Sequence, residues 1–167
     1  LDIMINNAGI AGPTGNVEDL TLADWRRTLA VNLDGAFMCS RRAMPILKKN
    51  KGGCVINLSS AAGIFGFPRR TPYAAAKWAI VGFTKSLALE GGPHGIRVNC
   101  ICPGPVEGDR IERVINAEAK ASGRPVDEVR AATVKFTAMK TFVTAGDIAN
   151  MILFLCSPAG ARISGQA

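Results

Sequence analysis

Short apolar runs alternate with long helical patterns along this chain, and that alternation constrains its fold more than any other feature. Three of the runs are predicted strands, at residues 1–6, 55–60 and 96–101. The first shows no polar alternation, which is typical of a parallel strand covered on both faces. Because helical segments separate the strands, the order favours one α/β domain over residues 1–167, a doubly wound parallel sheet in three α/β/α layers. Ligands of such sheets bind at the carboxyl ends of the strands.

Caps and glycine breaks delimit the predicted helices. The spacing Thr21-x-x-Asp24 resembles a capping box, and apolar residues at helical spacing extend this helix to about Lys49. Further helices are predicted over two later segments, 73–90 and 148–156. The intervening segment 108–140 is polar and irregularly helical, and we expect it to be a substrate-binding lid.

The chain is basic, with 20 Lys and Arg against 13 Asp and Glu and a net charge of +7. These basic residues are scattered over different predicted elements with little aromatic interleaving, so we interpret them as solvated surface and expect no nucleic-acid partner. No apolar run approaches the roughly 20 residues that cross a bilayer, so we expect no membrane segment and a cytoplasmic location.

Five cysteines show no disulfide-framework spacing, and we interpret them as buried, reduced thiols. Cys100 and Cys102 form the nearest pair, and we expect their thiols on opposite faces of the third predicted strand. The single histidine, His94, lies in a helix-to-strand loop and is expected at the surface. These observations argue against a Ser-His-Asp triad and predict no metal site.

Tyr73 and Lys77 lie four residues apart in a predicted helix, so their side chains share one face, about 6 Å apart along the axis. A neighbouring ammonium stabilises a phenolate, which allows Tyr73 to exchange a proton as general acid or base. Ser60 ends the preceding predicted strand, where its hydroxyl can hydrogen-bond a substrate oxygen. Together the three groups suit a reaction in which negative charge builds on a carbonyl oxygen.

These residues belong to a wider pattern of short motifs. The pattern comprises Asn6-Asn7-Ala8-Gly9, Val31-Asn32-Leu33-Asp34-Gly35, Ser59-Ser60-Ala61-Ala62-Gly63, Tyr73-Ala-Ala-Ala-Lys77, Arg97-Val98-Asn99 and Pro103-Gly104. Its order and spacing resemble the classical short-chain dehydrogenase/reductase family over essentially the whole chain. The resemblance implies a Rossmann-like fold and hydride transfer between NAD or NADP and a ketone or secondary alcohol. It also implies Asn32, Ser60, Tyr73 and Lys77 as catalytic residues, with Asn32 at a helix irregularity that holds a water connecting Lys77 to solvent.

The same resemblance implies the cofactor-binding residues. Asn6, Ala8 and Gly9 match the segment on the adenosine side, where the role of Asn6 is mainly structural. Pro103 and Gly104 match backbone beside the nicotinamide, and Tyr73 and Lys77 match side chains that contact the cofactor. Many members place a threonine four residues after the glycine to hold the carboxamide, whereas this chain has Gly108 there. We therefore expect backbone or another side chain to make that contact.

By the family pattern, the glycine-rich turn that holds the cofactor pyrophosphate precedes residue 1, and the last strand follows Ala167. We thus expect a partial Rossmann domain truncated at both ends, with strand 1–6 as an exposed apolar edge and with poor cofactor binding and turnover by this chain alone. The resemblance implies a homodimer or homotetramer that packs through the helices around Asn32 and after Tyr73.

The favoured activity is in the style of 3-oxoacyl carrier-protein reductases and related alcohol dehydrogenases. One alternative is a catalytically silent cofactor-sensing or scaffold module. Another is an extended-family epimerase or dehydratase, for whose larger substrate domain residues 108–140 leave little room.

Overall fold

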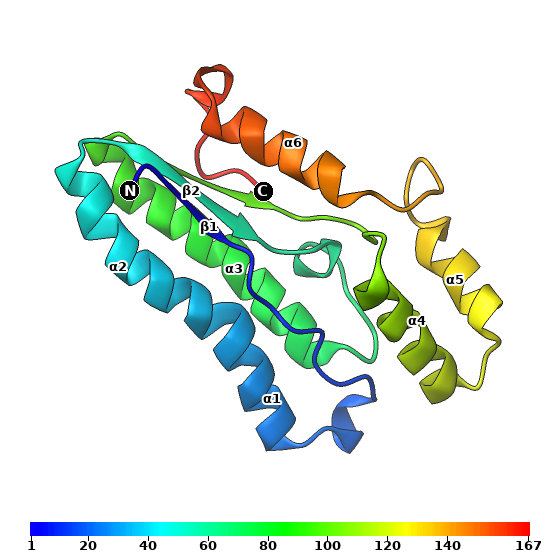
Figure 1. Cartoon of the computed structure of the whole chain (residues 1–167). Helices are drawn as coiled ribbons and strands as arrows, with labels where there is room; N and C mark the ends of the chain where they lie inside the picture. Colours follow the sequence, from blue (N-terminus) through cyan, green and yellow to red (C-terminus); the bar gives the residue numbers. More distant parts are fainter.

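A computed structural model describes all of residues 1–167 and confirms a Rossmann-like α/β fold with a parallel sheet (Figure 1). The strands are β1 (Ile3–Asn6), β2 (Gly53–Leu58) and β3 (Ile96–Ile101), in the order β1-β2-β3. Both pairings are parallel, and Asn6, Asn57 and Cys100 stand in register across the sheet. The carboxyl ends of all three strands therefore meet at one edge.

Helices cover both faces of this sheet. Val55 and Val98 pack against α2 (Gly35–Lys49) and α3 (Thr71–Gly91), whereas Ile56 and Leu58 pack against Leu155 of α6 (Ala145–Cys156). Neighbouring strand residues point to opposite faces, so the continuous apolar run of β2 serves two layers. The one-turn elements are η1 (Val17–Asp19), η3 (Ala61–Gly63), η4 (Gly92–His94) and η5 (Pro158–Gly160).

The predicted long helix forms, with an irregularity inside it. Thr21 caps α1 (Leu22–Leu29) by accepting a hydrogen bond from Asp24 N at 3.1 Å. Helical backbone then continues through a π-helical segment, η2 (Ala30–Asp34), into α2. A π-helical turn widens the helix locally and is common at functional sites. The irregularity expected around Asn32 is therefore present.

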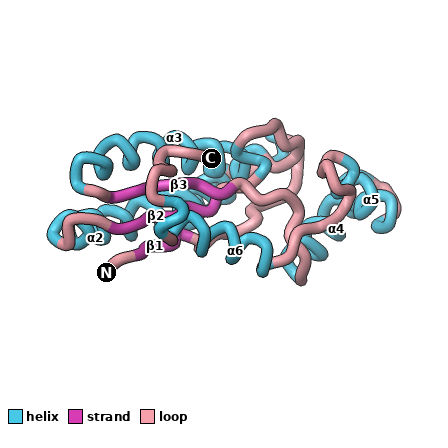
Figure 2. Tube along the Cα trace, turned by 90° about the horizontal axis from the view of Figure 1, so that it is seen from above, coloured by secondary structure: helices cyan, strands magenta, loops and turns pink.

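The segment predicted as a lid contains α4 (Asp109–Ser122) and α5 (Val126–Lys135). These helices pack on each other through a separate small cluster of Ile115, Ala119 and Val129. They lie beyond the ends of the strands in both views (Figures 1 and 2). The segment thus stands next to the sheet's carboxyl edge without belonging to the main core.

Several expectations about individual residues need correction. Strand β1 is not covered on both faces, because Ile3 and Ile5 are 45% and 44% exposed; it is the exposed apolar edge that the family pattern implied. Pairing at the other edge begins before Ala167, since Gly165 N donates to Val98 O at 2.7 Å and Gln166 O accepts from Cys100 N at 2.8 Å.

The cysteines also differ in part from expectation. Cys39 is exposed, so not all five thiols are buried, although all five are free. Cys100 and Cys102 lie with their sulfurs 4.0 Å apart. Residues two apart in an extended chain share a face, so the expectation of opposite faces was wrong. His94 is exposed, as expected. No helix has the combination of length and apolar character that a membrane span requires.

Candidate active site

Backbone hydrogen bonds hold the segments after β2 and β3 side by side at the carboxyl edge of the sheet. Ser59 N donates to Ile101 O and Ala61 N donates to Pro103 O, both at 2.8 Å. The backbone of both neighbours of Ser60 is therefore hydrogen-bonded to the segment at the end of β3, which fixes the position of Ser60. Its side chain is half-buried, and its Oγ accepts a hydrogen bond from Ala62 N at 3.2 Å. Because Ser60 is the acceptor there, its own O–H proton remains available to a substrate oxygen.

Lys77 reaches the same edge from the first half of α3. Its side chain is 4% exposed, and Nζ donates to Leu58 O, the last carbonyl of β2, at 2.7 Å. Nζ also lies 5.7 Å from the centroid of the Tyr73 ring. The four-residue spacing therefore does bring the ammonium and the phenol together. Burial, helped by the charge of Arg110, lowers the pKa of Lys77 from 10.5 to about 8.

Asn32 is buried in the π-helical segment and binds the loop that follows β1. Its Oδ1 accepts from Ile10 N at 2.8 Å, and its Nδ2 donates to Ile10 O at 3.0 Å. A Cβ added at Gly9 would lie 2.7 Å from Asn32 Oδ1 and 3.8 Å from Lys77 Nζ. The Gly9 backbone therefore lies next to the side chains of Asn32 and Lys77, and a side chain at position 9 would displace the Asn32 amide. The water relay expected at Asn32 stays a prediction.

Asn6 holds the elements behind the site together. Its Nδ2 donates to Ser40 Oγ at 3.0 Å and to Asn57 Oδ1 at 2.7 Å, and Asn57 Nδ2 donates to Thr84 Oγ1 at 2.8 Å. This chain of polar contacts ties β1, α2, β2 and α3 together, consistent with a mainly structural role. Sequence reasoning missed Asn57 and Thr84, because their contacts span 51 and 27 residues and leave no local signal.

Three cations surround the half-buried ring of Tyr73. Arg70 Cζ lies 5.2 Å and Arg110 Cζ lies 5.9 Å from the ring centroid, in addition to Lys77 Nζ. Neither arginine was singled out from the sequence. Arg70 is the N-cap of α3 and precedes the predicted helix 73–90, and the turn at Arg69 that places it left no local signal. Arg110 lies at the start of α4, and no local sequence signal indicated that it would contact Tyr73.

The predicted cofactor segments lie around this group. Ala8 and Gly104 are exposed, and Gly9 and Pro103 are half-buried, at the ends of β1 and β3. Gly108, which replaces the threonine of many family members, has φ of 121°. That conformation disfavours a residue with a side chain, so the departure has a backbone cause. Histidine, cysteine and carboxylate side chains do not gather in threes or more anywhere in the chain.

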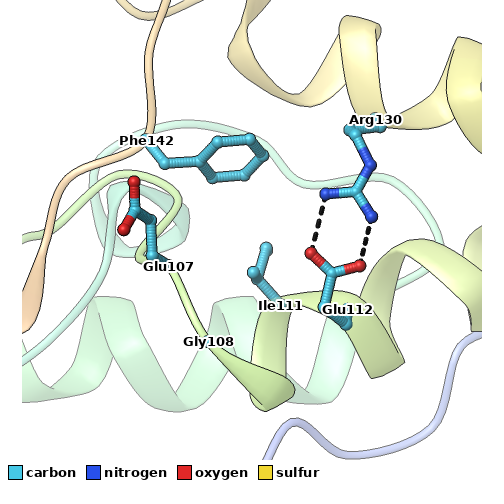
Figure 3. A pocket seen from close by; sticks show the side chains of 6 residues that line it. All are labelled: Glu107, Gly108, Ile111, Glu112, Arg130 and Phe142. Carbon is cyan, nitrogen blue, oxygen red and sulfur yellow. Dashed lines mark hydrogen bonds and ion pairs between the residues drawn. The ribbon is translucent and has the colours of Figure 1, made fainter.

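A pocket of about 230 Å³ lies between residues of the predicted lid 108–140 and residues that flank it in the sequence (Figure 3). Its lining residues are Glu107, Gly108, Ile111, Glu112, Arg130 and Phe142. An ion pair between Glu112 and Arg130 closes one side of it (Figure 3). None of the predicted catalytic residues Ser60, Tyr73 and Lys77 lines this pocket.

Comparison with known proteins gives a consistent result. A family model described as enoyl-(acyl carrier protein) reductase matches residues 1–167. An oxidoreductase of Thermotoga maritima is 41% identical over 161 residues, covering 96% of this chain and 62% of that protein. The D-beta-hydroxybutyrate dehydrogenase of Rhizobium meliloti is 37% identical over 165 residues, covering 98% and 64%.

Solved structures agree with these sequence matches. NAD+-bound xylitol dehydrogenase superposes with a TM-score of 0.96 at 27% identity, covering 99% of this chain and 66% of that one. This chain thus spans 62% to 66% of the length of these relatives. Since the family match extends over the whole chain and these relatives are oxidoreductases, the chain belongs to the short-chain dehydrogenase/reductase family.

Proposed function

We propose that the protein containing this chain is an NAD(P)-dependent oxidoreductase that interconverts a secondary alcohol and a ketone. The observation that carries the proposal is the buried Lys77 ammonium, 5.7 Å from the Tyr73 ring, beside the strand end that presents Ser60. Burying an ammonium next to a phenol costs free energy. Groups whose pKa is perturbed by such burial cluster at functional sites.

The surroundings of each proposed catalytic residue support a particular role. During reduction, Ser60 donates a hydrogen bond to the substrate oxygen as negative charge builds on it. Tyr73 gives its phenolic proton to the same oxygen, and Lys77 stabilises the phenolate that remains. With a pKa of about 8, Lys77 can also pass a proton onward near neutral pH. In alcohol oxidation the same groups act in the reverse order.

A nicotinamide cofactor fits the residues at this edge. Gly9, which has no side chain, leaves its backbone accessible next to Lys77 after β1. Pro103 and Gly104 follow β3, on the other side of the central strand β2. Bound there, NAD or NADP supplies or accepts the hydride. One solved relative is described as NAD+-bound, which supports this cofactor class. We propose Asn6, Ala8, Gly9, Tyr73, Lys77, Pro103 and Gly104 as cofactor-binding residues and residues 108–140 as the substrate lid.

We further propose a homo-oligomer that works in the cytoplasm. Large apolar side chains are exposed on α2 and α3, and Phe37, Met38, Trp78 and Leu89 are 44% to 81% exposed. Such surface favours burial against a second copy. Five free thiols suit a reducing compartment. Sedimentation of the complete protein will test the first proposal, and a monomer at micromolar concentration would contradict it.

Replacing Tyr73 with Phe in the complete protein tests the proposed reaction. The change keeps the ring and removes the proton donor, so we expect kcat for ketone reduction to fall roughly 10²- to 10⁴-fold. Circular dichroism and NAD(P)H binding should remain those of the wild type. Near wild-type turnover by Tyr73→Phe would contradict the assignment. Cofactor binding without turnover of any carbonyl compound by the wild type would favour a silent module instead.

A further inference from the structure

Arg70 is a buried cation whose hydrogen-bonding capacity is only partly used. Its side chain is 4% exposed, and Nη2 donates to Ala11 O at 2.7 Å. The Nε atom is buried without any hydrogen-bond partner. An unpaired donor on a buried charge is costly, which makes an orphaned Nε–H a candidate contact for a ligand.

The neighbouring residue fixes the direction of Arg70. Arg69 adopts φ of 59°, in the left-handed region that residues with side chains rarely occupy. Its carbonyl accepts from Gly15 N at 3.0 Å, and its guanidinium pairs with Glu118 of α4. Held from both sides, Arg69 turns the chain so that Arg70 lies over Tyr73. Backbone strain of this kind concentrates at functional sites.

Arg110 approaches Tyr73 from the lid. It is the second residue of α4, it is exposed, and its Nη1 donates to Gly9 O at 3.3 Å. Neither Arg110 nor Arg70 forms an ion pair, whereas Glu112 and Glu118 of α4 are paired with Arg130 and Arg69. The ring of Tyr73 is therefore flanked by two guanidinium groups that have no carboxylate partner.

We propose that Arg70 and Arg110 bind an anionic group of the substrate, a carboxylate or a phosphate, close to the carbon that exchanges hydride. A guanidinium presents a planar set of donors that matches either anion, and two of them beside the proton donor fix the substrate's orientation. The inference rests on the proposed function. It makes the two arginines specificity-determining residues, while Ser60, Tyr73 and Lys77 perform the reaction.

Matched charged and neutral compounds test the proposal in the complete protein. The carboxylate arm compares 3-hydroxybutyrate with its methyl ester, and the phosphate arm compares sorbitol 6-phosphate with sorbitol. A charge-assisted hydrogen bond corresponds to about a 10- to 100-fold change in affinity. We expect at least a tenfold preference in kcat/KM for the charged member of one pair, and the arm that shows it identifies the anion.

Variants of the two arginines locate that preference. Arg110→Gln and Arg70→Met should each reduce the ratio of kcat/KM values, charged over neutral, by about tenfold or more, mainly through KM. Arg70→Lys should restore part of the ratio. Arg113→Gln removes one exposed positive charge from the same helix and serves as the matched control with an unchanged ratio. Because Arg70 is buried, thermal unfolding of each variant is measured, and Arg110→Gln carries the test if Arg70→Met does not fold.

Calorimetric binding separates this inference from the proposed function, since it needs no turnover. Tighter binding of the charged member in one arm, weakened by Arg110→Gln and unaffected by Arg113→Gln, supports the anion site even if the protein does not catalyse the reaction. Equal binding of charged and neutral members in both arms overturns the anion site. In that case, ketone reduction that depends on Tyr73 would still support the proposed function.

Discussion

The sheet edge and the α4–α5 segment meet at the same site but are held by different forces. At the sheet edge Lys77 and Asn32 are buried, at 4% and 2% exposure, and their side chains hydrogen-bond to backbone. In the α4–α5 segment a small apolar cluster holds two helices together, and nearby Phe136 is 92% exposed. Rigid packing suits groups that move protons, and loose packing suits a segment that adapts to substrates.

Polar contacts of two arginines connect these regions. Arg69 of the sheet-edge loop pairs with Glu118 of α4, and Arg110 of α4 donates to Gly9 O at 3.3 Å. Such contacts across a loosely packed boundary allow one region to open while the other keeps its shape. Substitutions in one region or the other should therefore have separable effects on stability and activity.

Paired truncations of equally buried isoleucines compare the two packing regimes. Ile80 lies in α3 beneath the site and Ile115 lies in α4, and each is 1% exposed. We expect Ile80→Ala to lower the free energy of unfolding by about 2 to 5 kcal/mol. Ile115→Ala should lower it by about 1 kcal/mol or less, because its helices can open before the main core unfolds.

Urea unfolding measures the free energy of unfolding of both variants, and limited proteolysis with amide hydrogen exchange reports local opening. Residues 108–140 should become more susceptible in Ile115→Ala, with little change in the sheet. Equal loss of global stability in the two variants would show that the segment is as firmly integrated as the core.

The buried charge of Lys77 gives the sheet edge a pH-dependent stability. Its pKa is about 8 in the folded chain against an ordinary value of 10.5. At pH values between these two pKa values the unfolded state binds more protons than the folded state. The free energy of unfolding of the wild type therefore increases as the pH rises. Relative to Lys77→Met, which does not titrate, the gain should reach about 2 to 3 kcal/mol between pH 7.5 and 10.5.

Lys85→Met, on the exposed side of the same helix, is the control for charge removal, and we expect it to track the wild type across this range. Urea titrations at pH 7.5, 9 and 10.5 provide the measurement. A constant difference between wild type and Lys77→Met at all three values would mean that burial does not shift the pKa of Lys77.

Two adjacent serines separate reaction from support at the sheet edge. Ser60 is half-buried with its proton available, whereas Ser59 is buried and donates to Lys77 O at 2.7 Å. We expect Ser60→Ala to lower kcat for ketone reduction by about 10²-fold without a change in stability. Ser59→Ala should cost about 1 kcal/mol of stability with a smaller effect on kcat. A large loss of kcat in Ser59→Ala with a loss of stability in Ser60→Ala would contradict these roles.

Sequence reasoning predicted what local patterns encode. The bounds of β3 and the cap at Thr21 were predicted, because apolar runs and capping residues act over a few positions. The proximity of Tyr73 and Lys77 followed from helical spacing. Exposure of β1 depends on which elements cover it, which its apolar composition alone did not reveal.

Contacts between distant segments could not be predicted in this way. Arg70, Arg110 and Asn57 depend on a strained turn at Arg69, on the start of α4 and on a pairing across the sheet. Each requires knowledge of the folded backbone. The face shared by Cys100 and Cys102, in contrast, followed from strand periodicity and was within reach of the sequence.

Transfer of label from the cofactor tests the central claim most directly. The complete protein would be incubated with a ketone and with NADH or NADPH carrying deuterium at C4 of the nicotinamide, on each face in turn. We predict that one of the labelled faces delivers deuterium to the carbinol carbon of the alcohol product, and that Tyr73→Phe abolishes this transfer in the same time. Alcohol product that contains no deuterium from either face would contradict hydride transfer at this site.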